Sequence, residues 1–264
     1  MNAPIGVIDS GVGGLTVAKA IMELLPNEEI IYIGDTARCP YGPRGDKEVR
    51  HFTWQLAQKL EQLNVKMLVI ACNTATAVAL ESLQKHMPFP VVGVINPGAR
   101  AAVKKTKRSE IVVLATEGTV KSGAYELALK SLNTKAKIYP LACPTFVPLV
   151  ESGEYEGRFS YDLVKEGLKP LNGIRFDTVI LGCTHYPILQ KQIEAAVGEG
   201  VTVLSSAEET AKDVESILRF NSKLRTSKEP PKHRFFASGS VPIFKSIAKR
   251  WLQLDEIDVK RISF

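Results

Sequence analysis

The sequence is poor in cysteine and has no long apolar run. It holds 4 cysteines in 264 residues, without C-x-x-C or H-x-x-x-H spacing, which argues against a zinc knuckle and a thioredoxin-type redox pair. The apolar runs have strand length, well below the roughly 20 residues of a membrane span. The N-terminal segment MNAPIGVIDSG has neither a basic start nor a long apolar stretch. We therefore expect no secretory signal, no membrane segment, free thiols and a cytoplasmic location.

The chain also lacks a concentrated charge of one sign. The formal net charge is +6, but Lys and Arg are scattered and aromatic residues are not interleaved with them, so we expect no requirement for nucleic acid. The densest basic cluster, KKTKR at 104–108, ends a helical pattern, where cations interact favourably with the helix C-terminus. A solvated surface explains this charge, and a weaker alternative is a positive field that favours an anionic substrate.

What the sequence does contain is an alternation of short buried strands and amphipathic helices. The strand-like segments PIGVIDS, EIIYIGD, VKMLVIA and FPVVGVI enclose helical patterns at 15–25, 46–63 and 74–86, as is typical of parallel α/β sheets. The pattern then restarts, because the strand, turn and helix of 110–129 parallel those of 4–23. We predict an α/β fold of two similar parallel-sheet lobes with the active site in the cleft between them.

The pattern changes near the start of the last quarter of the chain. Ser206 and Glu209 have the spacing of a capping box at a helix start, and a polar, proline-containing linker follows at 222–233. The remaining tail is too small for a core of its own, so we expect it to return to the first lobe. The predicted division is 1–96 plus 207–264 for the lobe that carries Cys72, and 97–206 for the lobe that carries Cys183.

Two cysteines have matching surroundings. Cys72 in VIACNTATA and Cys183 in VILGCTHYP each follow a buried strand and precede polar residues. Parallel α/β sheets bind ligands beyond the carboxyl ends of their strands, where helices begin. Because a helix start lowers the pKa of a thiol, we expect both cysteines to be reactive. For Cys39 and Cys143 we keep the alternative that a cysteine is a small, buried apolar residue.

Two equivalent thiols that are not a redox pair favour a reaction that is itself nearly symmetric. Inversion of a stereocentre is such a reaction, because a base on one face of a carbon removes a proton and an acid on the other face returns one. A thiol with an ordinary pKa of roughly 8.5 reaches both forms near neutral pH. The sequence therefore predicts proton transfer between Cys72 and Cys183, one from each lobe.

Polar residues next to the thiols fit this chemistry. In DSGVGG, Asp9 is suited to orient or assist one thiol, and Ser10 with nearby N–H groups to hold a substrate carboxylate; the glycine spacing is not that of a dinucleotide site. His185 is the natural partner of the second thiol and would keep it ionised, with a purely structural histidine as the alternative. Glu151 carries less weight from its chemistry alone, because acidic loop residues are usually only solvated.

Taken together, six segments in order resemble the cofactor-independent glutamate racemases. They are IGVIDSGVGGLTV, YIGDTARCPYGPR, VIACNTATA, GVINPGA, ATEGTVKSGAY and LGCTHYPIL. The resemblance implies an isomerase that interconverts L- and D-glutamate for peptidoglycan synthesis, without pyridoxal phosphate or metal. It also implies two α/β lobes, with the C-terminal segment returning to the first, and a homodimer is common among such enzymes.

The resemblance also implies roles for individual residues. Cys72 and Cys183 would be the two bases, with Asp9 assisting Cys72, and with His185 and Glu151 assisting Cys183. The substrate would be held by Asp9, Ser10, Pro40, Tyr41, Gly42, Asn73, Thr74, Thr76, Thr116, Thr119, Thr184 and His185.

Two rival functions remain open at this point. An aspartate racemase would need the same two thiols and a shorter side-chain pocket. A two-lobed amino-acid-binding protein would also clamp its ligand between lobes, but paired reactive thiols argue against it.

Overall fold

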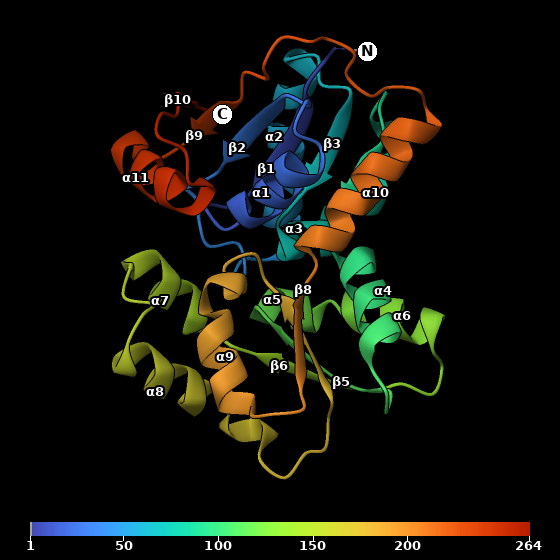
Figure 1. The fold of residues 1–264 in the computed structure, drawn as a ribbon, viewed down its shortest axis with the longest axis vertical. Helices are drawn as coiled ribbons and strands as arrows, with labels where there is room; N and C mark the ends of the chain where they lie inside the picture. The colour runs from blue at the N-terminus through green and yellow to red at the C-terminus, as the bar shows by residue number, and fades with distance from the viewer. Residues whose placement is uncertain (1) are drawn as a thin grey trace.

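The computed structural model describes residues 2–264 and has two lobes, each built on its own sheet (Figure 1). Within this part of the chain, the strands form a six-stranded and a four-stranded sheet, and all strand pairs are parallel. Helices pack against these sheets, as expected when strands are fully buried runs such as IGVID and MLVI. The predicted α/β class with two parallel-sheet lobes is confirmed.

The larger sheet has the strand order β10-β9-β2-β1-β3-β4. Its lobe contains the first and the last elements of the chain, and helices lie on both sides of the sheet (Figure 1). These elements are β1 (Ile5–Asp9), α1 (Leu15–Leu24), β2 (Ile30–Gly34), α2 (Asp46–Gln62), β3 (Met67–Ile70), α3 (Asn73–His86), β4 (Val91–Gly93), α10 (Ala207–Phe220), β9 (Arg234–Ala237), α11 (Val241–Leu252) and β10 (Val259–Arg261).

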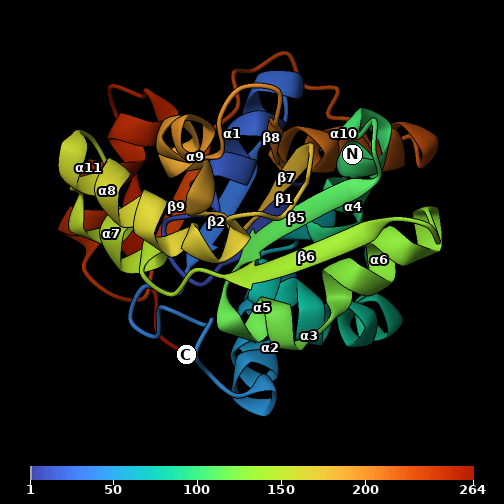
Figure 2. The same cartoon turned by 90° about the horizontal axis from the view of Figure 1, so that it is seen from below.

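The smaller sheet has the order β6-β5-β7-β8, and Figure 2 shows it from below, with α6 near one edge and α8 and α9 toward the other side. The elements of its lobe are α4 (Ile95–Lys105), β5 (Glu110–Ala115), α5 (Glu117–Lys121), α6 (Ala124–Leu132), β6 (Lys137–Ala142), α7 (Phe146–Ser152), α8 (Arg158–Gly167), the short 3-10 helix η1 (Lys169–Leu171), β7 (Thr178–Gly182), the 3-10 helix η2 (Tyr186–Leu189), α9 (Gln190–Val197) and β8 (Thr202–Ser205).

The two lobes repeat one strand arrangement. The order β2-β1-β3-β4 in the larger sheet corresponds to β6-β5-β7-β8 in the smaller one. In the register of β1 with β3, Ile8 pairs with Ile70, and two residues further this register sets Ser10 beside Cys72. In the register of β5 with β7, Ala115 pairs with Gly182, and one residue further it sets Thr116 beside Cys183. The two cysteines thus stand at equivalent strand ends.

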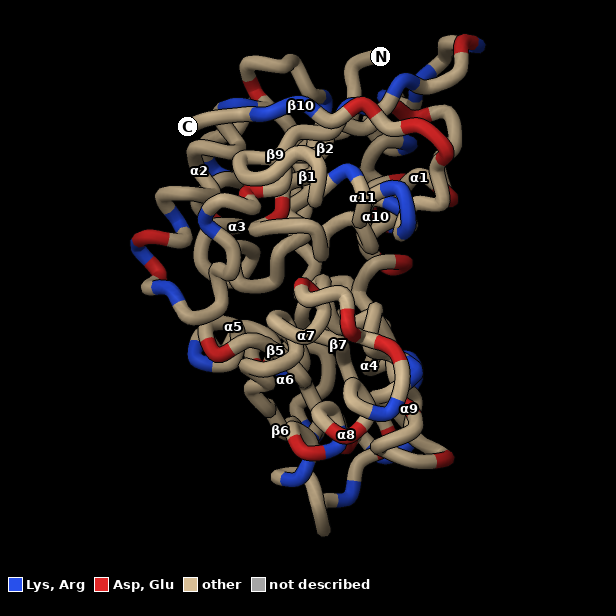
Figure 3. The backbone as a smooth tube through the Cα atoms, turned by 90° about the vertical axis from the view of Figure 1, so that its left-hand side faces the viewer, with Lys and Arg blue, Asp and Glu red and all other residues tan. Residues whose placement is uncertain are grey.

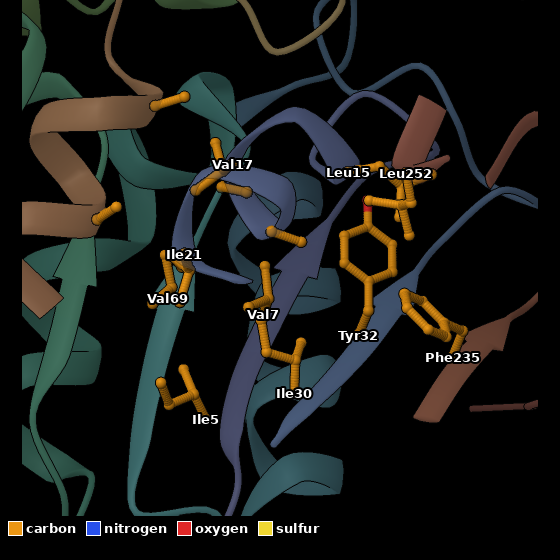
Figure 4. Close-up of a cluster of buried hydrophobic side chains, with 14 of the residues drawn as sticks. Ile5, Val7, Leu15, Val17, Ile21, Ile30, Tyr32, Val69, Phe235 and Leu252 are labelled. Atoms are coloured by element: carbon orange, nitrogen blue, oxygen red, sulfur yellow. The ribbon is translucent and has the colours of Figure 1, made fainter. Parts of the chain in front are cut away.

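Apolar side chains on both faces of the larger sheet form its core. On one face, α1 buries Leu15 and Ile21 against Val7 and Tyr32 (Figure 4). The ring of Tyr32 also lies 6.3 Å from that of Phe235, centroid to centroid. Full burial of one such side chain stabilises the fold by about 1.5–3 kcal/mol, so this cluster anchors the strand end from which Asp9 and Ser10 project.

The C-terminal tail extends the larger sheet. β9 pairs in parallel with β2, so that Phe235 lies beside Tyr32, and β10 pairs with β9. Helices α10 and α11 both pack on α1. The expectation that the tail returns to the first lobe agrees with this pairing.

The predicted capping box at the start of α10 is wrong. Ser206 is the N-cap, but its backbone is helical and its side chain makes no cap hydrogen bond, because a capping hydroxyl needs an extended backbone to reach back over the first turn. Instead, Ser205 Oγ accepts a hydrogen bond from the N–H of Ala207 at 3.1 Å. Glu209 binds Lys212 at 2.6 Å, within the same helix.

Helices α4 and α10 lie at the two places where the chain passes from one lobe to the other. α4 packs on α6 and β7 of the second lobe, whereas α10 packs on α1 of the first. The two helices also contact each other, and Arg100 Nη2 lies 2.5 Å from Asp213 Oδ2. This ion pair therefore joins the lobes at the position where the chain crosses.

Charged residues of both signs are interspersed over both lobes (Figure 3). At the KKTKR cluster, Lys104 and Lys105 lie in the last turn of α4, and Asp177 accepts hydrogen bonds from the N–H groups of Lys107 and Arg108. The cluster thus ends a helix as predicted. Among residues 2–264, no helix is both long enough and apolar enough to cross a membrane.

Candidate active site

Cys72 and Cys183 line one cavity between the lobes. The cavity is ≈ 20 Å³, which is room for about one water molecule. Eleven of the predicted site residues are on its wall, together with Val147, which sequence reasoning missed. The lining residues are Ser10, Pro40, Tyr41, Gly42, Cys72, Asn73, Thr74, Thr116, Val147, Cys183, Thr184 and His185.

The thiol of Cys72 lies at the start of α3, as predicted. Cys72 is the N-cap residue, and its sulfur accepts a hydrogen bond from the N–H of Ala75 at 3.5 Å. The thiol donates to Ser10 Oγ at 3.8 Å. Burial raises the pKa of Cys72 to about 12, with a smaller contribution from the charge of Asp9. The prediction of a lowered pKa is therefore wrong here, because desolvation outweighs the hydrogen bond from the helix start.

The surroundings of Cys183 differ from that prediction in another way. The chain after Cys183 forms the short 3-10 helix η2, and α9 begins only at Gln190, so no α-helix start faces this thiol. Instead, Sγ of Cys183 lies 3.9 Å from Nδ1 of His185. The other ring nitrogen, Nε2, lies 2.6 Å from Oε1 of Glu151.

His185 carries a positive charge at neutral pH. Burial by itself lowers the pKa of the ring, but the hydrogen bonds and charges of Cys183 and Glu151 outweigh it and raise the pKa to about 10. A cation beside a sulfur stabilises a thiolate. The cavity is therefore electrostatically asymmetric, with an imidazolium next to Cys183 and a carboxylate, Asp9, acting on Cys72.

Asp9 lies behind the cavity wall and joins the lobes. Its Oδ1 accepts a hydrogen bond from the N–H of Gly11 at 3.0 Å, and its Oδ2 accepts one from Oγ1 of Thr184 at 3.2 Å. Burial raises the pKa of Asp9, while the charge of His185 and the hydrogen bonds partly offset this. Asp9 thus acts on Cys72 through its charge, and on the second lobe through Thr184.

Three threonines from both lobes form a cluster of hydroxyls. Oγ1 of Thr74 lies 2.9 Å from that of Thr116 and 3.2 Å from that of Thr119, and the latter two are 3.0 Å apart. Thr119 lies behind the lining residues. The predicted Thr76 is also outside the cavity wall, because its hydroxyl donates to the carbonyl of Ile70 at 3.0 Å.

The loop after β2 closes the cavity from the first lobe. The hydroxyl of Tyr41 donates to Asp35, so this group is already occupied by the protein. The carbonyl of Gly42 accepts from the N–H of Gly118 at 2.9 Å. A Cβ atom at Gly42 would lie 2.7 Å from Cβ of Thr116, so only glycine permits this approach of the lobes.

Asn73 lines the cavity and has an unused donor. The hydroxyl of Tyr125, which lies in the second lobe, donates to Oδ1 of Asn73 at 2.8 Å. Its Nδ2 is buried and has no hydrogen-bond partner among the described residues. A buried unsatisfied donor costs about 1–3 kcal/mol, so this amide can gain stability from a hydrogen-bond acceptor.

Two residues of the site, Tyr125 and Val147, could not be predicted from the sequence. Tyr125 stands in AYELALKSL, a segment whose helical periodicity indicates only a packing residue. Val147 is one apolar residue of FVPLV, which likewise carries no chemical signal. Both acquire a role only through the contact between the lobes.

Comparison with known proteins places this geometry in a family. The model of the Asp/Glu/hydantoin racemase family matches residues 5–214. A glutamate racemase of Lysinibacillus sphaericus is 73% identical over 263 residues, covering 100% of this chain and 99% of that protein.

Solved structures agree over nearly the whole chain. A glutamate racemase isoform from Bacillus anthracis is 49% identical with a TM-score of 0.95, covering 99% of this chain and 97% of that one. A glutamate racemase from Francisella tularensis in complex with D-glutamate is 35% identical with a TM-score of 0.92, covering 99% and 98%. An aspartate racemase from Picrophilus torridus is 20% identical with a TM-score of 0.55, covering 86% and 96%, a likeness of fold alone. This chain belongs to the Asp/Glu/hydantoin racemase family.

Proposed function

We propose that this chain is a glutamate racemase that interconverts L- and D-glutamate by proton transfer at the α-carbon. The observation that carries the proposal is that two thiols from opposite lobes, Cys72 and Cys183, line one buried cavity. A carbon held between them has one sulfur on each face. That arrangement permits removal of a proton on one side and return of a proton on the other.

In one direction Cys183 is the base and Cys72 is the acid. His185 lies next to the sulfur of Cys183 and assists it, and Glu151 holds the ring through Nε2. The raised pKa of Cys72 keeps it protonated at neutral pH, so it is ready to donate. The thiol proton then moves to the α-carbon, and the proton removed by Cys183 stays on that sulfur.

In the other direction the roles exchange. Cys72 must first lose its proton, and we propose that Asp9, whose own pKa is raised, assists this step. His185 then helps Cys183 to donate. The two directions therefore use different neighbours to prepare the same kind of thiol.

The α-proton of an amino acid is far less acidic than a thiol, so the substrate must be activated by binding. We propose that Nδ2 of Asn73 and the hydroxyls of Ser10, Thr74 and Thr184 bind the charged groups of glutamate, together with the other predicted residues that line the cavity. Asp9, Thr76 and Thr119 would support these groups from behind the cavity wall. Fixed donors in a site without bulk water stabilise developing negative charge on the carboxylate more strongly than water does. With thiols as both acid and base, we propose no cofactor.

Glutamate cannot enter a cavity of ≈ 20 Å³ unless the lobes move apart. We propose that they open to admit it and close around it. Hydrogen exchange measured with and without D-glutamate should show protection of the loops after β1, β3 and β5. Unchanged exchange in all three loops would contradict closure.

Four further points belong to this proposal. We divide the chain into 1–96 plus 207–264 and 97–206, which the strand pairing supports. We propose that its D-glutamate is used in peptidoglycan synthesis. We also propose that the protein is cytoplasmic, which the free thiols of its four cysteines support. We also propose a homodimer.

The decisive experiment uses each pure enantiomer of glutamate in deuterated water with wild type, Cys72→Ser and Cys183→Ser. We expect each variant to lose racemisation by at least about 100-fold, because inversion needs a proton carrier on both faces. Cys143→Ser is the control for loss of a thiol. If either active-site variant racemises at the wild-type rate, the two-thiol mechanism is wrong.

Aspartate is the competing substrate. The same assay with aspartate should give much slower turnover than with glutamate. Faster turnover of aspartate would make the chain an aspartate racemase and would leave the two-thiol mechanism in place.

A further inference from the structure

Three metal-ligating side chains meet beside the active site. The sulfur of Cys39, the carboxylate of Glu151 and a ring nitrogen of His185 all lie within 4.8 Å of one another. Cys39 comes from the loop after β2 in the first lobe, whereas Glu151 in α7 and His185 after β7 come from the second. The proton-transfer mechanism uses the last two residues and leaves Cys39 without a role.

The donor set matches zinc. A thiolate, an imidazole and a carboxylate are its usual protein ligands, and three of them with a fourth position open is a common arrangement. Bonds of 2.0–2.3 Å in a tetrahedron put the donor atoms about 3.3–3.8 Å apart. Shifts on the order of 1 Å from the present separations would reach this geometry, chiefly by widening the 2.6 Å contact of His185 Nε2 with Glu151 Oε1.

The surroundings leave space and access for an ion. A Cβ atom at Gly11 would lie 3.0 Å from the sulfur of Cys39 and 3.5 Å from Oε1 of Glu151, so glycine at this turn lets both side chains approach the same point. The side chain of Glu151 is 35% exposed and Cys39 is half-buried. An ion can therefore reach the group from solvent.

We propose that Cys39, Glu151 and His185 form an inhibitory binding site for Zn²⁺ that ties the two lobes together. On binding, sulfur and ring nitrogen donate lone pairs to the ion, while the thiol proton of Cys39 and the Nε2 proton of His185 pass to the solvent. His185 then binds the ion through Nε2, keeps the proton on Nδ1 and is no longer an imidazolium cation. The lobes are cross-linked at the cavity, so substrate exchange stops.

The binding part of this inference does not depend on the proposed reaction and is tested without it. Cobalt(II) serves as a spectroscopic substitute for zinc, because a bound thiolate gives an intense sulfur-to-cobalt absorption band in the near ultraviolet. We expect one equivalent of Co²⁺ to produce this band in wild type and in Cys143→Ser, and Zn²⁺ to displace it. The band should be absent in Cys39→Ser and Cys39→Ala, provided that their unfolding midpoints without metal match wild type.

The inhibitory part rests on the proposed racemase activity. Racemisation of D-glutamate at fixed free Zn²⁺ should be inhibited in wild type and Cys143→Ser, with at least a tenfold higher inhibition constant in Cys39→Ser. A cobalt band that persists in both Cys39 variants, or no band in wild type, would overturn the site. Equal zinc inhibition of wild type and Cys39→Ser would show that the ion inhibits without Cys39 and would overturn the site too.

Discussion

The thiol of Cys72 lies at the first turn of the 14-residue helix α3 and bonds to Ser10 and to a backbone N–H. The thiol of Cys183 precedes only a 3-10 turn, and an imidazolium held by a carboxylate lies next to it. The backbone of the two lobes is repeated, yet the chemistry at the two strand ends is not. Two residues after the cysteine, one lobe has Thr74 and the other has His185. The repeated fold therefore places two equivalent thiols in one site. Single neighbouring side chains then give the two thiols different chemical surroundings.

The largest test of this asymmetry is His185→Asn. We expect kcat/KM to fall by about 100-fold, equally in both directions, because enantiomers have an equilibrium constant of one. The asymmetry should appear in the α-deuterium isotope effect, which should increase for the enantiomer whose proton Cys183 removes. Asp9→Asn should increase it for the other enantiomer. The same change for both enantiomers in both variants would contradict distinct roles for the two sides.

The next test concerns the residue that orients Asn73. Tyr125→Phe removes the hydrogen bond to Oδ1 and frees the amide to rotate, so we expect KM to rise about 5–10-fold, equivalent to about 1–1.4 kcal/mol, with a smaller change in kcat. Tyr155→Phe is the control, since its hydroxyl contacts Trp251 instead. A fall in kcat at constant KM would argue against a positioning role for Tyr125.

The pH dependence of stability should distinguish the two sides as well. The pKa of His185 is about 10 in the folded protein and roughly 6.5 in the unfolded chain. Its protonation therefore stabilises the fold fully below pH about 6.5, and this contribution is lost as the pH rises through about 10. Urea unfolding at pH 7 and pH 10 should show that the free energy of unfolding falls by about 3–4 kcal/mol, and His185→Asn should lack this decrease. An identical decrease in the variant would mean that other groups cause it.

The smallest effect is expected at the crossing between the lobes. Arg100 and Asp213 are partly exposed, with 35% and 32% of their side-chain surface accessible, and such pairs contribute about 0–1 kcal/mol. Asp213→Asn should therefore change the free energy of unfolding by less than about 1 kcal/mol and leave kcat unchanged. A loss of several kcal/mol would show that this pair holds the lobes in place.

Much of the fold could be predicted because burial patterns are local. The alternation of strands and helices, the restart near residue 110 and the return of the tail all follow from apolar periodicity and segment length. The start of α10 could not be predicted in detail, since the capping role of Ser206 depends on its backbone angles. Cys72 and Cys183 were found because a cysteine followed by polar residues at a strand end is unusual in a buried segment.

The sequence by itself determined that two thiols stand at equivalent strand ends of two repeated lobes, because strand pattern and neighbouring residues are encoded side by side. Only the tertiary structure decided what surrounds each thiol. Glu151 reaches His185, Tyr125 reaches Asn73, and Cys39 reaches both Glu151 and His185 across stretches of chain that carry no local signal for these contacts. The pKa of Cys72 likewise rises instead of falling, because desolvation depends on packing from both lobes and not on the helix that follows it.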